Sequence, residues 1–155
     1  ALDTPYELDA RRCIAYLTIE HKTAIPESLR GLMGNRVFGC DDCQLVCPHN
    51  GSPGKGDALF APRHGLDNPD LVEIFSWSLE QFEKYTNGSP LRRLGYERWM
   101  RNLAVALGNG RPSETATRAL RSRLGEISDM VDEHILWALE RLDARGIPAI
   151  GVQEY

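Results

Sequence analysis

The sequence of 155 residues contains no apolar run of the eighteen or so residues that a membrane-spanning helix needs. Its first residues also lack the basic start and the apolar core of a secretion signal. We therefore expect a protein that does not enter membranes, is located in the cytoplasm and acts as a monomer. Its length and its ordinary globular composition predict one compact domain or two small ones.

Several kinds of catalytic motif are absent as well. The glycines between Gly51 and Gly56 lack the preceding strand and the following helix of a phosphate-binding loop. No general acid and no nucleophile paired with a base can be recognised, and no segment has the pattern of a strand. The histidines are scattered, which favours structural roles for all four: His21, His49, His64 and His134. We therefore identify no catalytic residue in this sequence.

Cysteine is scarce, with four residues in total, and three of them fall close together. They form the run Cys40-Asp41-Asp42-Cys43-Gln44-Leu45-Val46-Cys47-Pro48. Bacterial ferredoxins hold iron-sulfur clusters with C-x2-C-x2-C-x3-C-P, in which the cysteine before the proline ligates the other cluster of a pair. The run matches the last three cysteines of that pattern and therefore predicts iron-sulfur ligands.

One ligand of the ferredoxin pattern is missing, because Val37 stands where the first cysteine is expected. The only other cysteine is Cys13, far upstream of Cys40. A zinc site and inert buried thiols are alternatives, although this spacing is not typical of zinc. Since no secretion signal is present, the clustered cysteines indicate metal binding rather than disulfides.

Capping residues and apolar periodicity predict helices along most of the chain. A first helix, Ala10 to about Glu20, is capped by Asp9 and turns Cys13 toward the core. Gly39 allows a tight turn before Cys40. Further helices are predicted at Pro26 to Leu32, Asp41 to Val46, Asp70 to Phe75, after a Ser78–Gln81 capping box, Ser89 to Gly108, Ser113 to Leu124 and Ser128 to Gly146.

The segment between Pro48 and Pro69 is rich in proline, glycine and polar residues, which is typical of a linker. We place a domain boundary there and predict two parts, residues 1–57 and residues 58–155. The predicted fold class is mainly α, with half of a two-cluster ferredoxin-like iron-sulfur module followed by a HEAT-like helical-repeat domain. Since there is no strict internal repeat, the HEAT interpretation depends on the succession of helices and on a family resemblance.

Charge is distributed unevenly along the chain. From Arg92 to Arg123, eight arginines and no lysine stand against two glutamates, so this block carries +6 while the net charge is −4. Guanidinium groups bind phosphate through paired hydrogen bonds, which favours contact with a nucleic acid. Arg98 and Arg101 would share one helix face, as would Arg118 and Arg121. The alternative is a solvated helix surface, or pairing with the acidic remainder.

Two further blocks accompany the cysteine run. They are Asp9-Ala10-Arg11-Arg12-Cys13-Ile14-Ala15-Tyr16-Leu17-Thr18-Ile19-Glu20 and Gly34-Asn35-Arg36-Val37-Phe38-Gly39. In their relative spacing these blocks and the run resemble epoxyqueuosine reductases, a family that uses cobalamin and iron-sulfur clusters to complete queuosine in tRNA. The resemblance extends over the whole chain. It identifies the chain with the family's C-terminal part, just after a full ferredoxin-type run ending C-P-T-G.

The resemblance implies roles for the four cysteines. Cys13, Cys40 and Cys43 would hold one [4Fe-4S] cluster together with a cysteine of the upstream run, and Cys47 would complete a second cluster. The chain by itself therefore lacks ligands for both clusters. We expect residues 1 to about 57 to be poorly ordered or rearranged in the absence of metal, while the helical part stays folded.

The resemblance also implies cobalamin and tRNA contacts. Cobalamin would lie against the cluster part, near Ala15, Asp41 and Asp42. Position 15 is usually serine in the family, so the alanine leaves only its backbone for this contact, and the two aspartates could instead serve the start of a helix. The tRNA would bind the helical part through four arginines: Arg92, Arg93, Arg98 and Arg101.

The sequence thus predicts part of an oxidoreductase that removes the epoxide oxygen of epoxyqueuosine at the tRNA wobble position. Electrons would come from an external donor through the clusters, and the proton donor is expected in the N-terminal domain of the family. We expect the part by itself to be inactive. The alternative function is a non-enzymatic helical-repeat module with a structural metal knuckle, which binds nucleic acid or protein.

Overall fold

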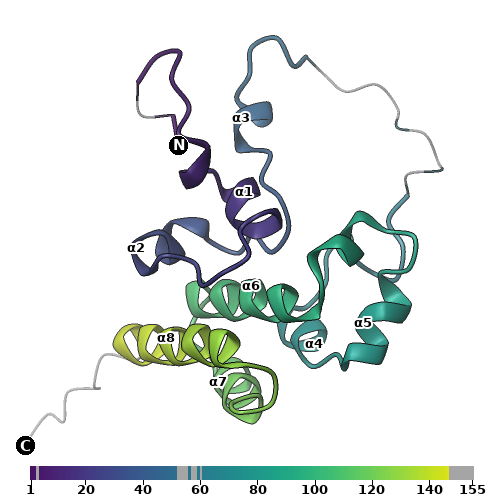
Figure 1. Ribbon diagram of the computed structural model, residues 1–155, viewed down its shortest axis with the longest axis vertical. Coiled ribbons are helices and arrows are strands. Elements are labelled where there is room, and N and C mark those ends of the chain that lie inside the picture. Colours follow the sequence, from purple (N-terminus) through teal and green to yellow (C-terminus); the bar gives the residue numbers. More distant parts are fainter. Residues whose placement is uncertain (3, 52–55, 57–58, 60, 147–155) are drawn as a thin grey trace, which may run out of the picture.

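The structure is a computed structural model, and it describes residues 1–2, 4–51, 56, 59 and 61–146. Within those residues the chain is helical and has no strand, apart from an isolated bridge between Thr4 and Glu7. The mainly α fold is therefore confirmed. The elements are η1 Ala10–Arg12, α1 Ile14–Ile19, α2 Glu27–Arg30, η2 Gly31–Met33, α3 Asp42–Leu45, α4 Leu71–Phe75, α5 Leu79–Tyr85, η4 Pro90–Leu94, α6 Tyr96–Asn109, α7 Glu114–Ser122 and α8 Asp129–Arg145, where η marks a 3-10 helix (Figure 1).

Side-chain caps fix where the helices begin. The Asp70 carboxylate accepts hydrogen bonds from two backbone N–H groups at the start of α4. Ser78 and Gln81 form the predicted reciprocal capping box at the start of α5. The Ser113 and Ser128 hydroxyls accept hydrogen bonds from the N–H groups of Ala116 and Val131 at the starts of α7 and α8. Each cap satisfies amides that a helix end leaves unpaired, and is worth about 1 kcal/mol.

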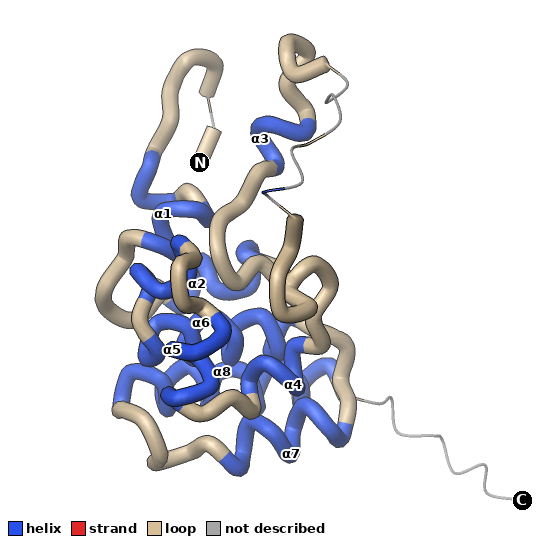
Figure 2. Tube along the Cα trace, turned by 90° about the vertical axis from the view of Figure 1, so that its right-hand side faces the viewer, coloured by secondary structure: helices blue, strands red, loops and turns tan. Residues whose placement is uncertain are grey.

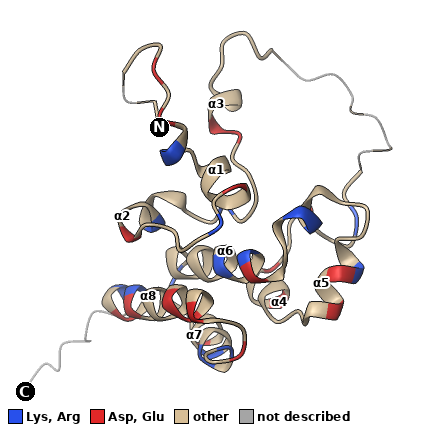
Figure 3. Cartoon of the chain, in the orientation of Figure 1, with Lys and Arg blue, Asp and Glu red and all other residues tan. Residues whose placement is uncertain are grey.

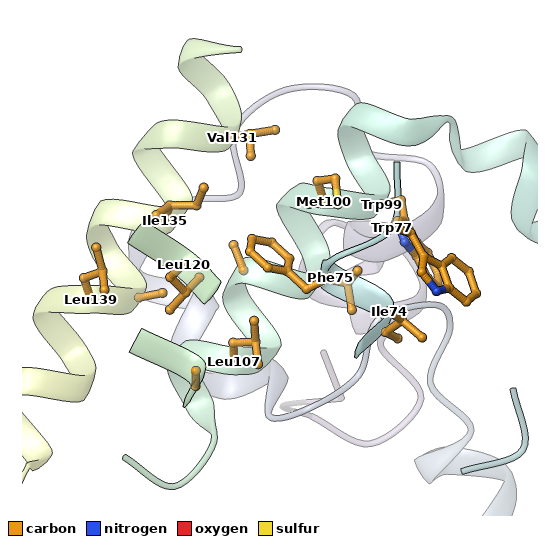
Figure 4. Packing of buried hydrophobic residues seen from close by; sticks show 14 of the residues in the cluster. Ile74, Phe75, Trp77, Trp99, Met100, Leu107, Leu120, Val131, Ile135 and Leu139 are labelled. Carbon is orange, nitrogen blue, oxygen red and sulfur yellow. The ribbon is translucent and has the colours of Figure 1, made fainter. Parts of the chain in front are cut away.

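Helix α6 is the centre of the molecule. Its residues from Trp99 to Gly108 are all buried. Figure 4 shows side chains from α4, α6, α7 and α8 meeting in one apolar cluster, including Phe75, Leu107, Leu120 and Ile135. Helix α8 approaches α6 closely at Gly108, where a Cβ atom would lie 2.8 Å from the Cα of Ala138. No helix in the described ranges is long and apolar enough to cross a membrane.

A second apolar cluster attaches the N-terminal segment to this body. Leu17, Ile25 and Met33 pack together with Val105 of α6. Farther along α6, the Asn109 side chain donates to the carbonyl oxygens of residues 30 and 34, at 2.8 and 3.0 Å. Residues 14–39 therefore share a core with the helical body. The predicted boundary at residue 57 falls on a residue outside the described part of the chain.

Arg101 is fully buried between α6 and the N-terminal segment. Its guanidinium group donates to the carbonyl oxygens of Leu17, His21 and Thr23, at 2.9, 2.9 and 2.6 Å. Burial lowers the pKa of Arg101 to about 10, so the guanidinium group stays charged at neutral pH, and carbonyl dipoles compensate its charge. The expectation that Arg101 contacts phosphate is therefore wrong, because its charged group is used inside the fold.

Three predicted helices differ at their ends. The first breaks at Cys13, whose backbone is extended (φ −70°, ψ 128°), so Cys13 is the N-cap of α1 and does not lie within a helix. Gly95 separates η4 from α6, since its φ of +77° is a conformation that glycine adopts readily. Pro26 is the N-cap of α2 rather than part of its first turn. Arg92 and Arg93 consequently precede the long helix on which we predicted them.

His134 is a buried structural histidine, as predicted. Its Nδ1 donates to the carbonyl oxygen of Met130 at 2.6 Å, and its Nε2 accepts from the backbone N–H of Ile25 at 3.0 Å. Since a carbonyl only accepts and an N–H only donates, these partners select the neutral ring with its proton on Nδ1. Burial lowers the pKa of His134 from 6.5 to about 4.

We predict that His134 makes the fold sensitive to acid. In the unfolded chain His134 binds a proton near pH 6.5, whereas in the folded protein it does so only near pH 4. Because the folded pKa is the lower one, this contribution to stability is complete above pH 6.5 and is lost as the pH falls toward 4. The loss should be on the order of 3 kcal/mol.

Urea unfolding across this pH range measures the effect. The His134→Gln variant keeps an acceptor for the Ile25 N–H but cannot take up a proton, so its free energy of unfolding should fall less steeply with acid. The other titrating groups are common to both proteins, and they cancel in the comparison. Parallel pH profiles for the two proteins would contradict the prediction.

Candidate metal centre

The N-terminal loop, α1 and α3 project from one end of the helical body (Figures 1 and 2). The cysteines belong to this end: Cys13 is the N-cap of α1, Cys43 lies in α3, and Cys40 and Cys47 flank α3. All four are free thiols, and Cys43 is the exposed one. Gly39, directly before Cys40, has a φ of +77°, a conformation that glycine adopts readily.

Three of the four cysteines line one cavity. Cys13, Cys40 and Cys43 border a cavity of about 570 Å³, whereas Cys47 does not. The remaining wall is mostly apolar and includes Leu2, Ile14, Leu17, Met33 and Val46. The three cysteines that the family resemblance assigns to one cluster thus border the same cavity, and Cys47 does not.

The donor set fits an iron-sulfur cluster in its chemistry. Such clusters are held by cysteine thiolates, and an apolar surround limits the solvent access that helps to set their potential. In the described ranges, no three side chains of Cys, His, Asp or Glu are gathered closely enough to hold a metal ion. Residues 41–46 are all exposed, so the turn that carries Cys43 is free of tight packing and can close on a cluster.

An ion pair connects α3 to the preceding segment. The Arg36 guanidinium donates to both carboxylate oxygens of Asp42 at 2.7 Å, and this hydrogen bonding lowers the pKa of Asp42 below its usual value. Asp42 also borders the cavity, but the other predicted cobalamin residues, Ala15 and Asp41, do not. Asp41 is exposed at the N-cap of α3 and makes no capping hydrogen bond through its side chain.

The predicted nucleic-acid residues are used in different ways. Arg92 and Arg93 are exposed on η4, where Arg93 pairs with Glu20. Arg98 is partly buried and donates to two backbone carbonyls, and Arg101 is buried as described above. Figure 3 shows basic positions on α6, α7 and α8, with acidic positions interspersed on α8. The four arginines therefore do not form one continuous phosphate-facing surface.

Two buried polar residues next to the cysteine-bearing segments were not predicted from the sequence. Thr18 and Asn102 are both fully buried. The Thr18 hydroxyl accepts from the N–H of Gly39, the residue before Cys40, and the Asn102 amide donates to the carbonyl of Thr18. The sequence signal that could have identified Asn102 is its position as a polar residue inside the apolar stripe of α6, next to Leu103.

The cysteine-bearing part of the chain matches a known protein family. Residues 1–50 match the family described as a 4Fe-4S double cluster binding domain. This match contains all four cysteines, and it supports [4Fe-4S] binding by this part of the chain.

Curated relatives match nearly the whole chain. Epoxyqueuosine reductase from Pseudomonas aeruginosa is 61% identical over 140 residues, which are 88% of this chain and 38% of that protein. The enzyme of the same name from Salmonella typhimurium is 54% identical over 155 residues, which are 99% of this chain and 40% of that protein. The chain thus spans about two fifths of the length of these relatives.

Solved structures agree with the sequence relationship. A crystal structure of epoxyqueuosine reductase with a tRNA-Tyr epoxyqueuosine-modified tRNA stem loop has a TM-score of 0.79 and 27% identity, over 89% of this chain and 37% of that one. Epoxyqueuosine reductase from Bacillus subtilis gives a TM-score of 0.76 at 28% identity, with the same coverage. These matches favour the epoxyqueuosine reductase family over an unrelated helical-repeat module. In sequence and in fold, the chain belongs to the epoxyqueuosine reductase family as a part of its longer members.

Proposed function

We propose that this chain is the C-terminal part of an epoxyqueuosine reductase, where it supplies iron-sulfur ligands and a tRNA-binding helical part. The observation that carries the proposal is the cavity bordered by Cys13, Cys40 and Cys43, within the segment that matches a 4Fe-4S double cluster binding domain. The complete protein would be a cytoplasmic monomer. It would remove the epoxide oxygen of epoxyqueuosine at the tRNA wobble position, using an external electron donor.

Each cysteine has a defined part in this proposal. Cys13, Cys40 and Cys43 hold one [4Fe-4S] cluster with a fourth thiolate from another part of the enzyme, and Cys47, outside the cavity, ligates the second. The clusters supply electron transfer when they are bound. The apolar wall would limit water access to a cluster from the cavity side, and the exposed α3 turn would adjust to bring Cys43 to its ligand position.

The cobalamin contacts belong to the same end of the molecule. Cobalamin supplies the metal centre that reduces the substrate when it is bound. Asp42 borders the cavity and is held ionised by Arg36, and Asp41 beside it is exposed, so both present acceptors for amide donors of a corrinoid. Ala15 is partly buried on α1 and offers only its backbone.

The helical part would bind tRNA. Helix α7 packs on α8 and α8 packs on α6, a succession that supports a HEAT-like arrangement. Arg92 and Arg93 are exposed, so their side chains are the proposed phosphate contacts. Arg98 is partly buried, and its guanidinium group already donates to two backbone carbonyls. Arg101 is excluded from this set by its burial. The epoxyqueuosine reductase with the highest TM-score given above was crystallised with a tRNA stem loop.

The first test assigns the cysteines to clusters in the full-length protein. Cys13→Ala and Cys40→Ala should each remove the same cluster, because both residues line one cavity, and Cys47→Ala should remove the other. Iron and labile-sulfide content, with electron paramagnetic resonance spectra of the reduced protein, measure this. The Cys13/Cys40 double variant should lose no more iron than either single variant, whereas the Cys13/Cys47 double variant should lose both clusters.

Two results would contradict the cluster assignment. One is that Cys13→Ala and Cys47→Ala abolish the same resonance signal. The other is that protein purified without oxygen contains stoichiometric zinc and has no visible absorption. That result would indicate a structural metal site instead of iron-sulfur clusters.

The second test concerns tRNA. In the full-length enzyme, Arg92→Ala and Arg93→Ala should each weaken tRNA binding without changing the preference among anticodons, because phosphate contacts position and base contacts specify. Each lost contact should also reduce the slope of log affinity against log salt by about 0.7 to 0.9. Filter binding at several salt concentrations provides both quantities.

The matched control is Arg118→Ala, which removes an exposed arginine of the same basic block from α7. It should leave affinity and slope nearly unchanged, and circular dichroism should show that all variants are folded. If Arg92→Ala and Arg93→Ala bind tRNA like the wild type, η4 is a solvated surface and the tRNA contacts lie elsewhere.

A further inference from the structure

Two buried polar side chains stand between the helical body and the cysteine-bearing segments. Thr18 lies on α1 and Asn102 on α6, and neither exposes any surface to solvent. A buried polar group is costly unless it is hydrogen-bonded, and both residues are fully engaged with backbone atoms near the cysteines.

The Thr18 hydroxyl links the two segments that carry the cavity cysteines. It accepts a hydrogen bond from the N–H of Gly39 at 3.0 Å and donates its own proton to the carbonyl oxygen of Ile14 at 2.7 Å. Gly39 directly precedes Cys40, and Ile14 directly follows Cys13. The hydroxyl therefore connects the residues adjoining two of the three cavity cysteines, which lie far apart in the sequence.

Asn102 fixes the same two segments from the side of α6. Its Nδ2 donates to the carbonyl oxygens of Thr18 and Val37, each at 2.8 Å, and so joins α1 to the chain leading to Cys40. Its Oδ1 accepts from Nε and Nη2 of Arg101, at 3.1 and 3.0 Å. Because Arg101 has only donors, this contact determines which end of the amide faces the two carbonyls.

We propose that Thr18 and Asn102 are positioning residues that set the spacing between Cys13 and Cys40 and thereby the geometry of the bound cluster. The inference rests on the proposed function, since it requires a cluster at the cavity. Cys43 needs no such fixed support, because it lies on the exposed α3 turn. Of the three cysteines that border the cavity, Cys13 and Cys40 are therefore positioned by the helical body, and Cys43 moves with the α3 turn.

The test uses the full-length protein with its clusters, purified without oxygen. Thr18→Val removes the hydroxyl and keeps the branched shape, Thr18→Ser restores the hydroxyl, and Asn102→Ala removes both donations to the backbone. The readouts are the resonance spectrum of the reduced cluster and the rate of iron loss to a chelator. Thr18→Val and Asn102→Ala should each release iron about fivefold faster or more, which is the ratio that one lost hydrogen bond corresponds to. Their resonance spectra should also differ from that of the wild type. Thr18→Ser should behave like the wild type.

Asn109 provides a matched control on the same helix. Its amide also donates to two carbonyl oxygens, those of Arg30 and Gly34, but these adjoin no cysteine. Asn109→Ala should lower the melting temperature and leave the spectrum and the iron release unchanged. If Thr18→Val and Asn102→Ala also melt lower but keep the wild-type spectrum and iron release, their role is structural only and the proposal falls. If the wild-type protein holds no iron, the proposed function falls with it.

Discussion

The N-terminal segment depends on the face that α6 presents to the end of α1. The carbonyls of residues 17–19 accept hydrogen bonds from Arg101, Asn102 and Arg98, one side chain to each. A helix leaves its last carbonyls without partners, and a helix of six residues is not stable alone in water. Two guanidinium groups also place positive charge at the negative end of the helix dipole. Helix α1, and the cysteine that begins it, are therefore held by α6.

The cysteine-bearing part therefore contains one segment that packs against the helical body and one turn that does not. Residues 14–39 share buried side chains with the helical body, and their backbone carbonyls accept hydrogen bonds from its asparagine side chains, so their packing does not depend on a metal. The turn from residue 41 to residue 46 is exposed and is held mainly by the Arg36–Asp42 pair. Metal binding would therefore chiefly order this turn.

Short-range features were predictable from the sequence, and long-range ones were not. The caps at Asp9 and Ser78 were predicted because each depends on residues within one helical turn. The breaks at Cys13 and Gly95 were missed, because apolar periodicity continues across both and local backbone angles leave no trace in it. The cysteines could be grouped by a motif and a family resemblance, but the residues that support them from α6 could not.

The sequence likewise did not predict which arginines of the basic block are available to contact a phosphate. Arg98 and Arg101 do share a helix face, as the spacing predicts, but that face is turned toward α1 and away from solvent. Arg123 likewise donates to two backbone carbonyls preceding α5. A guanidinium group has five donors, so it can satisfy several buried carbonyls at once, and composition alone cannot distinguish this use from phosphate binding. The positive charge available to a phosphate backbone is therefore smaller than the net charge of the basic block.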